Sequence, residues 1–230
     1  ETLCADRPDI PEKGTKMGDY FRNNLRNYYA CITGVDENVG RIVDELKRNG
    51  LFDNTIVVFT SDHGVCMGAH ENDGKDIFYE EAMRIPMIIS WPERIKPRKE
   101  EKLMIAFADL YPSLLSLMGF QKEIPETVQT FDLSCQILGK NKREVVQPYY
   151  YVLFDNHATG YRGLRTKTHT FVVHATNGVI DDTILFDRTK DPYQMNNIAR
   201  QHPPLVQKLS KQLKDWLTQT DDSFANYLKL

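Results

Sequence analysis

The sequence has few cysteines, and none is spaced as a metal-binding or disulfide-rich motif requires. Four cysteines occur in 230 residues, at Cys4, Cys31, Cys66 and Cys135, and no two of them form a CxxC pair. This spacing argues against a structural zinc site and against a small disulfide scaffold. Because isolated cysteines usually pack as small apolar side chains, we expect each to be an ordinary buried or loop residue.

The sequence also lacks an excess of positive charge and a long apolar run. It has 29 Lys and Arg against 32 Asp and Glu, a net charge of -3, which gives no basic surface for nucleic acid or an anionic bilayer. No apolar run approaches the ~18 residues of a membrane span. The N-terminal residues ETLCADRPDI lack the plan of a signal peptide. We therefore expect no nucleic-acid or membrane partner, and either a soluble protein or a piece of a longer one.

What is present, with 41% hydrophobic residues, suits a folded α/β domain. Apolar residues from Phe21 to Leu46 recur at the spacing of one helical face, and Asn49-Gly50 supplies a left-handed cap. The runs Thr55 to Phe59 and Met87 to Trp91 are typical of strands covered on both faces. A long helix followed by buried strands predicts part of a parallel sheet.

Further elements follow with weaker signals. After Gly64 we expect a loop of about ten residues, then a short helix from Ile77 to Arg84. Leu103 to Ala108 is interpreted as another strand, and Asp109 as the cap of a helix that ends at Gly119.

The pattern changes in the last third of the chain. Residues 121–147 are irregular and polar, which indicates a seam between subdomains. Three runs beyond it predict an antiparallel sheet, with Asn177-Gly178 as a hairpin turn: Tyr149 to Phe154, Gly163 to Ala175 and Val179 to Asp187. A final amphipathic helix, carrying Leu205, Leu209, Leu213 and Trp216, covers one side of that sheet. We expect a catalytic α/β portion at 1–140 and an antiparallel β subdomain with a packed helix at 141–230.

Asp62 and His63 stand directly after the first predicted strand. In open α/β sheets, ligands gather beyond the carboxyl ends of strands, and Gly64 lets the backbone turn both side chains toward one point. A carboxylate and an imidazole make half of a mixed metal shell, which suits Ca²⁺, Mg²⁺ or Mn²⁺. The alternative is an Asx-type turn with an exposed histidine beside it.

Lys75 lies at the far end of the loop that leaves this strand. Loop closure brings its ammonium near the predicted metal, and two cations at one point require an anion between them. We therefore expect an oxyanion substrate, sulfate or phosphate. The alternative is a solvent-exposed lysine.

Four blocks of the chain follow one another in a recognisable order: RNYYACITGVDENVGRIVDELKRNGLFDNTIVVFTSDHG, GKDIFYEEAMRIPMIISWP, FADLYPSLLSLMGF and LFDRTKDPYQMNNIARQHP. In these blocks the chain resembles the second half of a type I sulfatase, of the alkaline-phosphatase-like superfamily. The resemblance implies the C-terminal part of an alkaline-phosphatase-like α/β sandwich, joined to the smaller antiparallel subdomain. It also implies that Asp62 and His63 are the metal pair, usually for calcium, and that Lys75 binds the sulfate of a sulfated small molecule or carbohydrate.

The family's nucleophile lies in the pattern Cys/Ser-x-Pro-x-Arg and is converted to formylglycine. No cysteine of this chain carries the pattern, so we take the nucleophile motif to be absent and the chain to be a C-terminal portion, inactive alone. In the complete enzyme the resemblance implies attack by hydrated formylglycine on sulfur, through a covalent sulfated intermediate. It also implies export to a periplasmic, extracellular or lysosomal location.

Several other residues are weaker candidates. His70, in the same loop, is a candidate second-shell or substrate-binding residue, with an exposed loop histidine as the alternative. Glu81 and Arg84 are interpreted as an ion pair on the short helix. His157 is a candidate for reading the non-sulfate part of the substrate, with packing in the sheet region as its default.

Two other functions remain open. One is a phosphonate or phosphate ester hydrolase of the same superfamily, and the other is a non-catalytic binding or scaffold module. Half of a parallel sheet would also leave an apolar strand edge unpaired, so we expect self-association through that edge.

Overall fold

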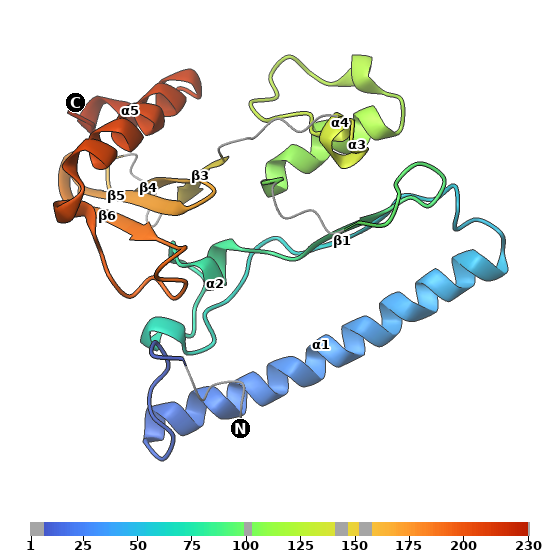
Figure 1. The fold of residues 1–230 in the computed structure, drawn as a ribbon, viewed down its shortest axis with the longest axis horizontal. Helices are drawn as coiled ribbons and strands as arrows, with labels where there is room; N and C mark the ends of the chain where they lie inside the picture. Colours follow the sequence, from blue (N-terminus) through green and yellow to red (C-terminus); the bar gives the residue numbers. More distant parts are fainter. Residues whose placement is uncertain (1–6, 99–102, 141–146, 152–157, 230) are drawn as a thin grey trace. The chain divides into compact units, whose positions relative to one another are not determined.

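The computed structural model describes residues 7–98, 103–140, 147–151 and 158–229, with the backbone alone for 147–151. The chain divides into two compact units, Glu1–Lys99 and Glu100–Leu230 (Figure 1). The division falls earlier in the chain than the predicted boundary between residues 140 and 141, which stays a prediction about the subdomains of the protein. No helix in the described part of the chain is long and apolar enough to cross a membrane.

The first unit begins with the long helix that the sequence predicts. Helix α1 runs over Lys16–Arg48 and is drawn as one continuous rod in Figure 1. Its start is fixed by the hydroxyl of Thr15, which accepts a hydrogen bond from the Gly18 amide at 3.0 Å. Its end is followed by Gly50 at φ 68°, the left-handed position expected after a helix.

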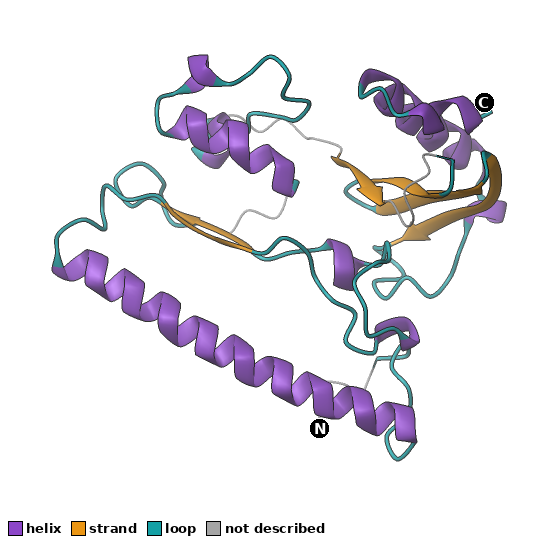
Figure 2. Cartoon of the chain, turned by 180° about the vertical axis from the view of Figure 1, so that it is seen from behind, coloured by secondary structure: helices purple, strands orange, loops and turns teal. Residues whose placement is uncertain are grey.

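The two strands of this unit differ from the prediction in their direction. Strand β1 (Val57–Thr60) and strand β2 (Met87–Ser90) form an antiparallel pair, in which Val57 lies opposite Ser90 and Thr60 opposite Met87 (Figure 2). The residues of both strands are partly exposed rather than buried on two faces. The expectation of a parallel, fully covered pair was wrong, because strand direction depends on the connection between strands and not on strand composition.

Between β1 and β2 the chain forms a loop and a short helix. The 3₁₀ turn η2 covers Ala69–Glu71, and helix α2 covers Glu80–Met83, shorter than the predicted span from Ile77 to Arg84. Tyr79 and Arg84 have extended backbones at the two ends of the helix, which limits it to four residues.

The second unit opens with short helical elements. They are η3 (Phe107–Asp109), α3 (Leu110–Leu117), η4 (Gln121–Glu123) and α4 (Ser134–Ile137). The predicted strand from Leu103 to Ala108 is not formed. Asp109 is buried and accepts hydrogen bonds from the amides of Ala106 and Phe131, so it ties a loop to α3 rather than capping that helix.

The rest of the second unit is an antiparallel meander covered by a helix, as predicted. Its strands lie in the order β3 (Gln147–Tyr151), β4 (Gly160–Arg165), β5 (His169–Thr176) and β6 (Val179–Asp187). The run predicted as one strand from Gly163 to Ala175 is divided between β4 and β5 by a turn. Asn177 and Gly178 form the expected hairpin turn, both at positive φ.

Helix α5 (Pro203–Gln219) packs on the sheet, followed by the 3₁₀ turn η6 (Ser223–Tyr227); η5 (Ala199–Gln201) precedes the helix. The core between them is made of apolar side chains from the strands, α5 and η6. Its members include Leu164, Phe171, Val173, Leu185, Leu209, Leu213, Leu217 and Phe224. This core confirms the predicted antiparallel sheet with a C-terminal helix.

Candidate functional site

Asp62 and His63 lie just beyond the end of β1, in a compact hydrogen-bonded turn. The His63 amide donates to Asp62 Oδ1 at 2.9 Å, and His63 Nε2 lies 3.4 Å from Asp62 Oδ2. The bond from the His63 amide lowers the pKa of Asp62 below its usual range. The Asp62 carboxylate is therefore ionised at neutral pH and available to a cation.

The second ring nitrogen of His63 fixes the tautomer of the imidazole. Nδ1 lies 2.8 Å from the carbonyl oxygen of Gly64, which only accepts hydrogen bonds, so Nδ1 carries the proton. Nε2 of the neutral ring then presents a lone pair. This is the arrangement of a metal-ligating histidine, whose other nitrogen donates to a carbonyl or carboxylate.

Lys75 reaches that lone pair from the far end of the loop. Its Nζ atom lies 2.7 Å from His63 Nε2, so the ammonium donates to the imidazole. The structure thus brings together the three residues Asp62, His63 and Lys75 that the sequence singled out. In this arrangement the ammonium uses the Nε2 lone pair that a metal ion would need.

Gly64 allows the turn by close approach rather than by an unusual backbone angle. Its amide donates to the carbonyl of Ala82 in α2 at 2.8 Å. A Cβ atom at position 64 would lie 2.0 Å from the carbonyl oxygen of Glu81. Only glycine fits there, and the pair Asp62–His63 is thereby fastened to α2.

The loop between the pair and Lys75 is closed on itself. The Cys66 amide donates to the Gly74 carbonyl at 2.9 Å, and the Gly68 amide donates to the Asn72 carbonyl at 2.8 Å. Gly68, at φ 101°, lies against the ring of Phe21 at the start of α1, where a Cβ atom would come within 2.6 Å of the ring. The loop is therefore packed on α1 as well as bonded across its base.

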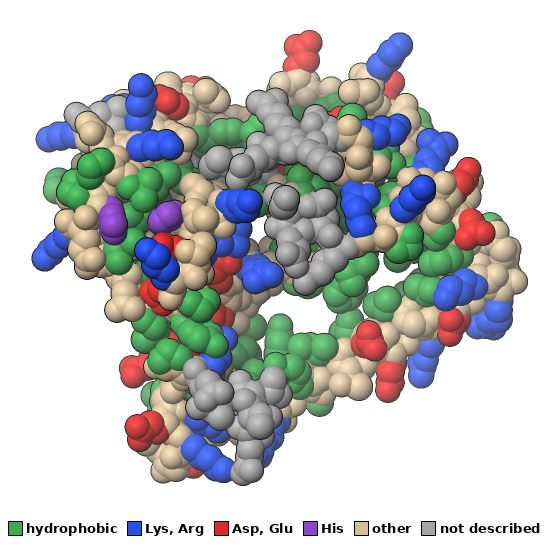
Figure 3. Space-filling view, in the orientation of Figure 1, with side chains coloured by type: hydrophobic (Ala, Val, Ile, Leu, Met, Phe, Trp, Pro, Cys, Tyr) green, Lys and Arg blue, Asp and Glu red, His purple; other side chains and the backbone are tan. Residues whose placement is uncertain are grey.

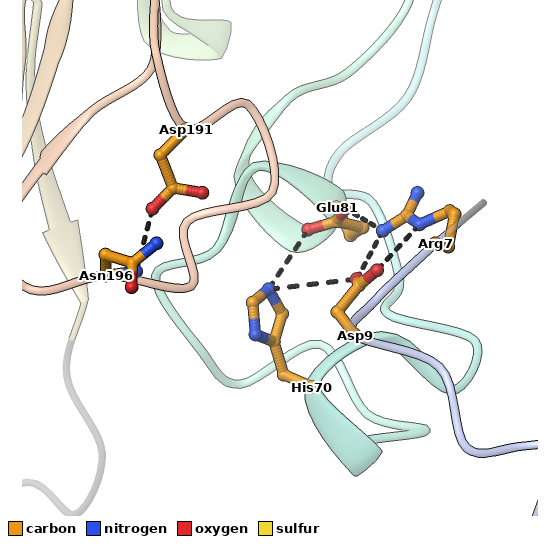
Figure 4. A network of polar contacts seen from close by, with 6 residues as sticks. All are labelled: Arg7, Asp9, His70, Glu81, Asp191 and Asn196. Atoms are coloured by element: carbon orange, nitrogen blue, oxygen red, sulfur yellow. Dashed lines mark hydrogen bonds and ion pairs between the residues drawn. The ribbon is translucent and has the colours of Figure 1, made fainter.

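His70 lies at the tip of this loop in a buried polar network (Figure 4). Its side chain is 8% exposed, and Nε2 lies 4.0 Å from Asp9 Oδ2 and 3.9 Å from Glu81 Oε2. Arg7 binds both carboxylates from their other side, with its Nε 2.9 Å from Asp9 Oδ1. The His70 ring also stacks on Tyr79, with 3.4 Å between the ring centroids.

This network differs from the local pairing expected from the sequence. Glu81 pairs with Arg7, 74 residues away, instead of Arg84. Arg7 and Asp9 were missed because nothing in the N-terminal sequence signals a partner so distant in the chain. The hydrogen bond to Asp9, and after it the hydrogen bond to Glu81, raise the pKa of Arg7. The prediction that His70 binds substrate stays a prediction, and the burial of its ring favours another role.

The donor atoms at the strand end fit part of a divalent-ion site. The described residues contain no group of three or more His, Cys, Asp or Glu placed to hold a metal. Asp62 and His63 therefore offer two ligands, whereas a hard cation such as Ca²⁺ takes six to eight. The chemistry of the pair fits such an ion, provided that further ligands come from elsewhere in the protein.

One match to the serine form of the nucleophile pattern escaped the sequence reasoning, which followed the cysteines. Ser90-Trp91-Pro92-Glu93-Arg94 reads Ser-x-Pro-x-Arg. Ser90 pairs with Val57, whereas the end of the ladder next to Asp62 pairs Thr60 with Met87. Three residues of strand separate the two ends by about 10 Å. Ser90 thus lies at the wrong end of the sheet to act at Asp62, and our prediction that the nucleophile lies outside this chain stays.

Three further histidine candidates fall in the last third of the sequence: His157, His169 and His174. His157 lies outside the described residues. His174 Nδ1 lies 2.5 Å from Asp181 Oδ1, and His169 Nδ1 lies 2.7 Å from the Thr168 hydroxyl. Both residues lie on β5 and contact neighbouring residues of the second unit.

Two family models match the chain. The model described as Sulfatase matches residues 4–120, and the model described as N-sulphoglucosamine sulphohydrolase, C-terminal, matches residues 68–223. Together they cover both units of the structure.

Individual relatives match along nearly the whole chain. An endo-4-O-sulfatase of Bacteroides thetaiotaomicron is 31% identical over 86% of this chain and 42% of its own length. An N-acetylglucosamine-6-O-sulfatase of the same organism is 32% identical over 85% of this chain and 37% of its own length. A crystal structure assigned to the sulfatases, yidJ of Bacteroides fragilis, is 74% identical, with a TM-score of 0.95 over 99% of this chain and 49% of that one. The chain thus spans less than half the length of each of these relatives.

Proposed function

Because this chain belongs to the sulfatase family, we propose that the protein containing it hydrolyses sulfate esters, with the cluster of Asp62, His63 and Lys75 binding the sulfate group. The chain has the fold of the C-terminal part of these enzymes. The observation that carries the proposal is the ammonium of Lys75, 2.7 Å from His63 Nε2, an atom that itself lies 3.4 Å from the ionised carboxylate of Asp62.

Each residue of the cluster has a distinct role in this proposal. The Asp62 carboxylate and the His63 Nε2 lone pair hold a divalent cation, which we take to be Ca²⁺. When bound, such an ion withdraws electron density from the sulfate oxygens and offsets their charge. Lys75 would donate to a sulfate oxygen, where it would stabilise the negative charge that builds during attack on sulfur.

The formylglycine nucleophile and the other metal ligands belong, in this proposal, to a part of the protein outside the 230 residues. The 230-residue chain alone should therefore not hydrolyse a sulfate ester. For the whole protein we propose a sulfated carbohydrate substrate. Its support is the names of two relatives, an endo-4-O-sulfatase and an N-acetylglucosamine-6-O-sulfatase.

The test compares two esters that share a leaving group. Full-length protein is assayed with an aryl sulfate and with the matching aryl phosphonate, before and after a chelator removes divalent ions. We expect faster hydrolysis of the sulfate, lost on chelation and restored by calcium. Preference for the phosphonate would favour the other hydrolase function, and turnover of neither ester would favour a binding module. Sulfated N-acetylglucosamine then serves as the carbohydrate substrate.

Two further properties complete the proposal. We propose export of the protein, on the resemblance to its family alone, and fractionation of cells followed by immunodetection tests it. We also propose that the 230-residue chain self-associates through the β1–β2 sheet. In the described part of the chain each of these strands has one hydrogen-bonded neighbour, so each has an open edge.

A further inference from the structure

The loop that joins His63 to Lys75 holds an energetically costly conformation. Met67, His70 and Glu71 have φ angles of 50°, 55° and 56°, in the left-handed region that non-glycine residues avoid. Such angles persist only where surrounding contacts over-determine them. The contacts at the loop tip are therefore candidates for what fixes the position of Lys75.

His70 makes the tip contacts in this loop. Its ring stacks on Tyr79 with an interplanar angle of 6°, and its Nε2 lies about equally far from the carboxylates of Asp9 and Glu81, at 4.0 and 3.9 Å. The Asp9 side chain is fully buried, and Glu81 is 17% exposed. Figure 4 shows the imidazole facing both carboxylates, with Arg7 beyond them.

Helix α2 holds the loop tip and the start of the loop together. The side chain of Glu81 faces His70, and the next residue, Ala82, accepts the Gly64 amide directly after His63. In the sequence Lys75 lies between His70 at the loop tip and Glu81 on α2, just past the bond from the Cys66 amide to the Gly74 carbonyl. A shift of the tip away from α2 would therefore move Lys75 relative to His63 while leaving His63 in place.

We propose that His70 is a positioning residue, which ties the loop tip to α2 and Asp9 and so sets where the Lys75 ammonium meets the sulfate. This inference rests on the proposed function of Lys75. It assigns no contact with substrate to His70, and it predicts that His70 affects the reaction only through Lys75.

A double-mutant cycle on the full-length protein tests whether His70 acts through Lys75. His70→Asn removes the ring, and asparagine tolerates the left-handed backbone at this position. Lys75→Ala should lower kcat/KM for an aryl sulfate about a hundredfold. His70→Asn should lower it about tenfold, since small misplacements of a reacting group cost one to two orders of magnitude. With both changes the loss should stay at about a hundredfold, because two residues acting through one contact are not additive.

Two outcomes of the cycle would overturn the proposal. A combined loss of about a thousandfold, the product of the single losses, means that His70 acts independently of Lys75, through substrate or general folding. Wild-type kinetics in His70→Asn mean that the tip contacts do not position Lys75. The control His202→Asn changes an exposed histidine of the second unit and should match wild type.

A second measurement is independent of catalysis. Amide hydrogen exchange of peptides covering residues 64–75 should rise in His70→Asn and stay unchanged in His202→Asn, and unchanged exchange in both overturns the proposal. If His70→Asn fails to fold, Glu81→Gln replaces it in both measurements, since it removes the charge facing His70 at nearly constant volume. If wild-type protein hydrolyses no sulfate ester, the proposed function fails, and the exchange result still decides the positioning role.

Discussion

The ammonium of Lys75 donates to His63 Nε2 across 2.7 Å, and the same nitrogen is the ring atom free to bind a metal ion. One lone pair cannot serve both, so binding of a cation at Asp62 and His63 must release Lys75. The released ammonium, next to a divalent ion, lies where an anion between the two is strongly stabilised. Under the proposed function, the Lys75 ammonium is therefore the group that would bind an oxyanion next to the cation.

Lys75→Ala should have opposite effects on turnover and on metal binding. Loss of the ammonium removes one stabilising group from the sulfate and should lower kcat/KM about a hundredfold in the full-length protein. It also removes a competitor for Nε2 and a nearby positive charge, so calcium affinity should rise. Steady-state kinetics and calorimetric calcium titration check the two effects, with Lys122→Ala, at an exposed lysine, as the control. Weaker calcium binding in Lys75→Ala would contradict this account.

Asp62→Ala should weaken calcium binding by the full-length protein. Asp62 is an ionised ligand in this proposal, and even residues that only orient metal ligands contribute about ten- to a hundredfold in affinity. We therefore expect at least a tenfold loss, measured by calorimetry, with Asp44→Ala on the exposed side of α1 as the control. Equal calcium affinity in the two variants would show that Asp62 is not a ligand of the ion.

Cys66 should resist alkylation where Cys31 reacts. Cys66 is 3% exposed, and burial raises the pKa of its thiol to about 11, whereas Cys31 lies exposed on α1. The thiolate is the reactive form, so iodoacetamide at pH 8.5 should label Cys31 and spare Cys66, as read by peptide mass spectrometry. The raised pKa of Cys66 also makes the free energy of unfolding depend on pH. Because the folded state holds the thiol proton more tightly than the unfolded state, the free energy of unfolding is unaffected below pH 9 and falls between about pH 9 and 11. Rapid labelling of Cys66 in folded protein would contradict its burial.

Local periodicity was sufficient to predict the elements that carry their own signal. Helix α1 has a three-and-four apolar pattern with Gly50 after its end, and the turn between β5 and β6 has Asn177-Gly178. The cluster of Asp62, His63 and Lys75 was predictable for a related reason. Its residues lie at the two ends of one loop, so that loop closure alone brings them together.

Features that depend on distant parts of the chain were not predictable in this way. The direction of β2 relative to β1 depends on the connection between the two strands, and Glu81 pairs with Arg7 across 74 residues of sequence. Neither feature leaves a pattern in the local sequence. The span from Leu103 to Ala108 is apolar enough for a strand, yet the buried carboxylate of Asp109 accepts hydrogen bonds from the Ala106 amide and from the Phe131 amide, 22 residues away, where the chain forms η3. Propensity is overridden there by one tertiary hydrogen-bond network.

The buried pair of Arg162 and Asp222 should contribute strongly to the stability of the second unit. Arg162 Nε lies 2.6 Å from Asp222 Oδ2, with the arginine side chain 2% exposed and the aspartate 13%. Asp222→Asn keeps the shape but removes the negative charge that lies against a buried guanidinium, which should cost about 3 kcal/mol. Its neighbour provides the control, because Asp221→Asn changes an exposed residue whose positive φ asparagine tolerates. Denaturant unfolding of the full-length protein checks both, and equal midpoints would contradict the expectation.

Self-association of the 230-residue chain should depend on the β1–β2 sheet and not on α1. Both carry an exposed isoleucine of nearly equal accessibility, Ile88 on β2 at 60% and Ile42 on α1 at 61%. Figure 3 shows hydrophobic side chains, in green, among the charged ones at the surface. A lysine on an edge strand opposes pairing with another strand, so Ile88→Lys should shift the chain toward monomer in sedimentation velocity. Ile42→Lys adds the same charge to a helix and should leave the association unchanged. A monomeric wild-type chain would refute self-association. If only Ile42→Lys dissociates the chain, the contact is made by the apolar side chains of α1 and not by the sheet edge.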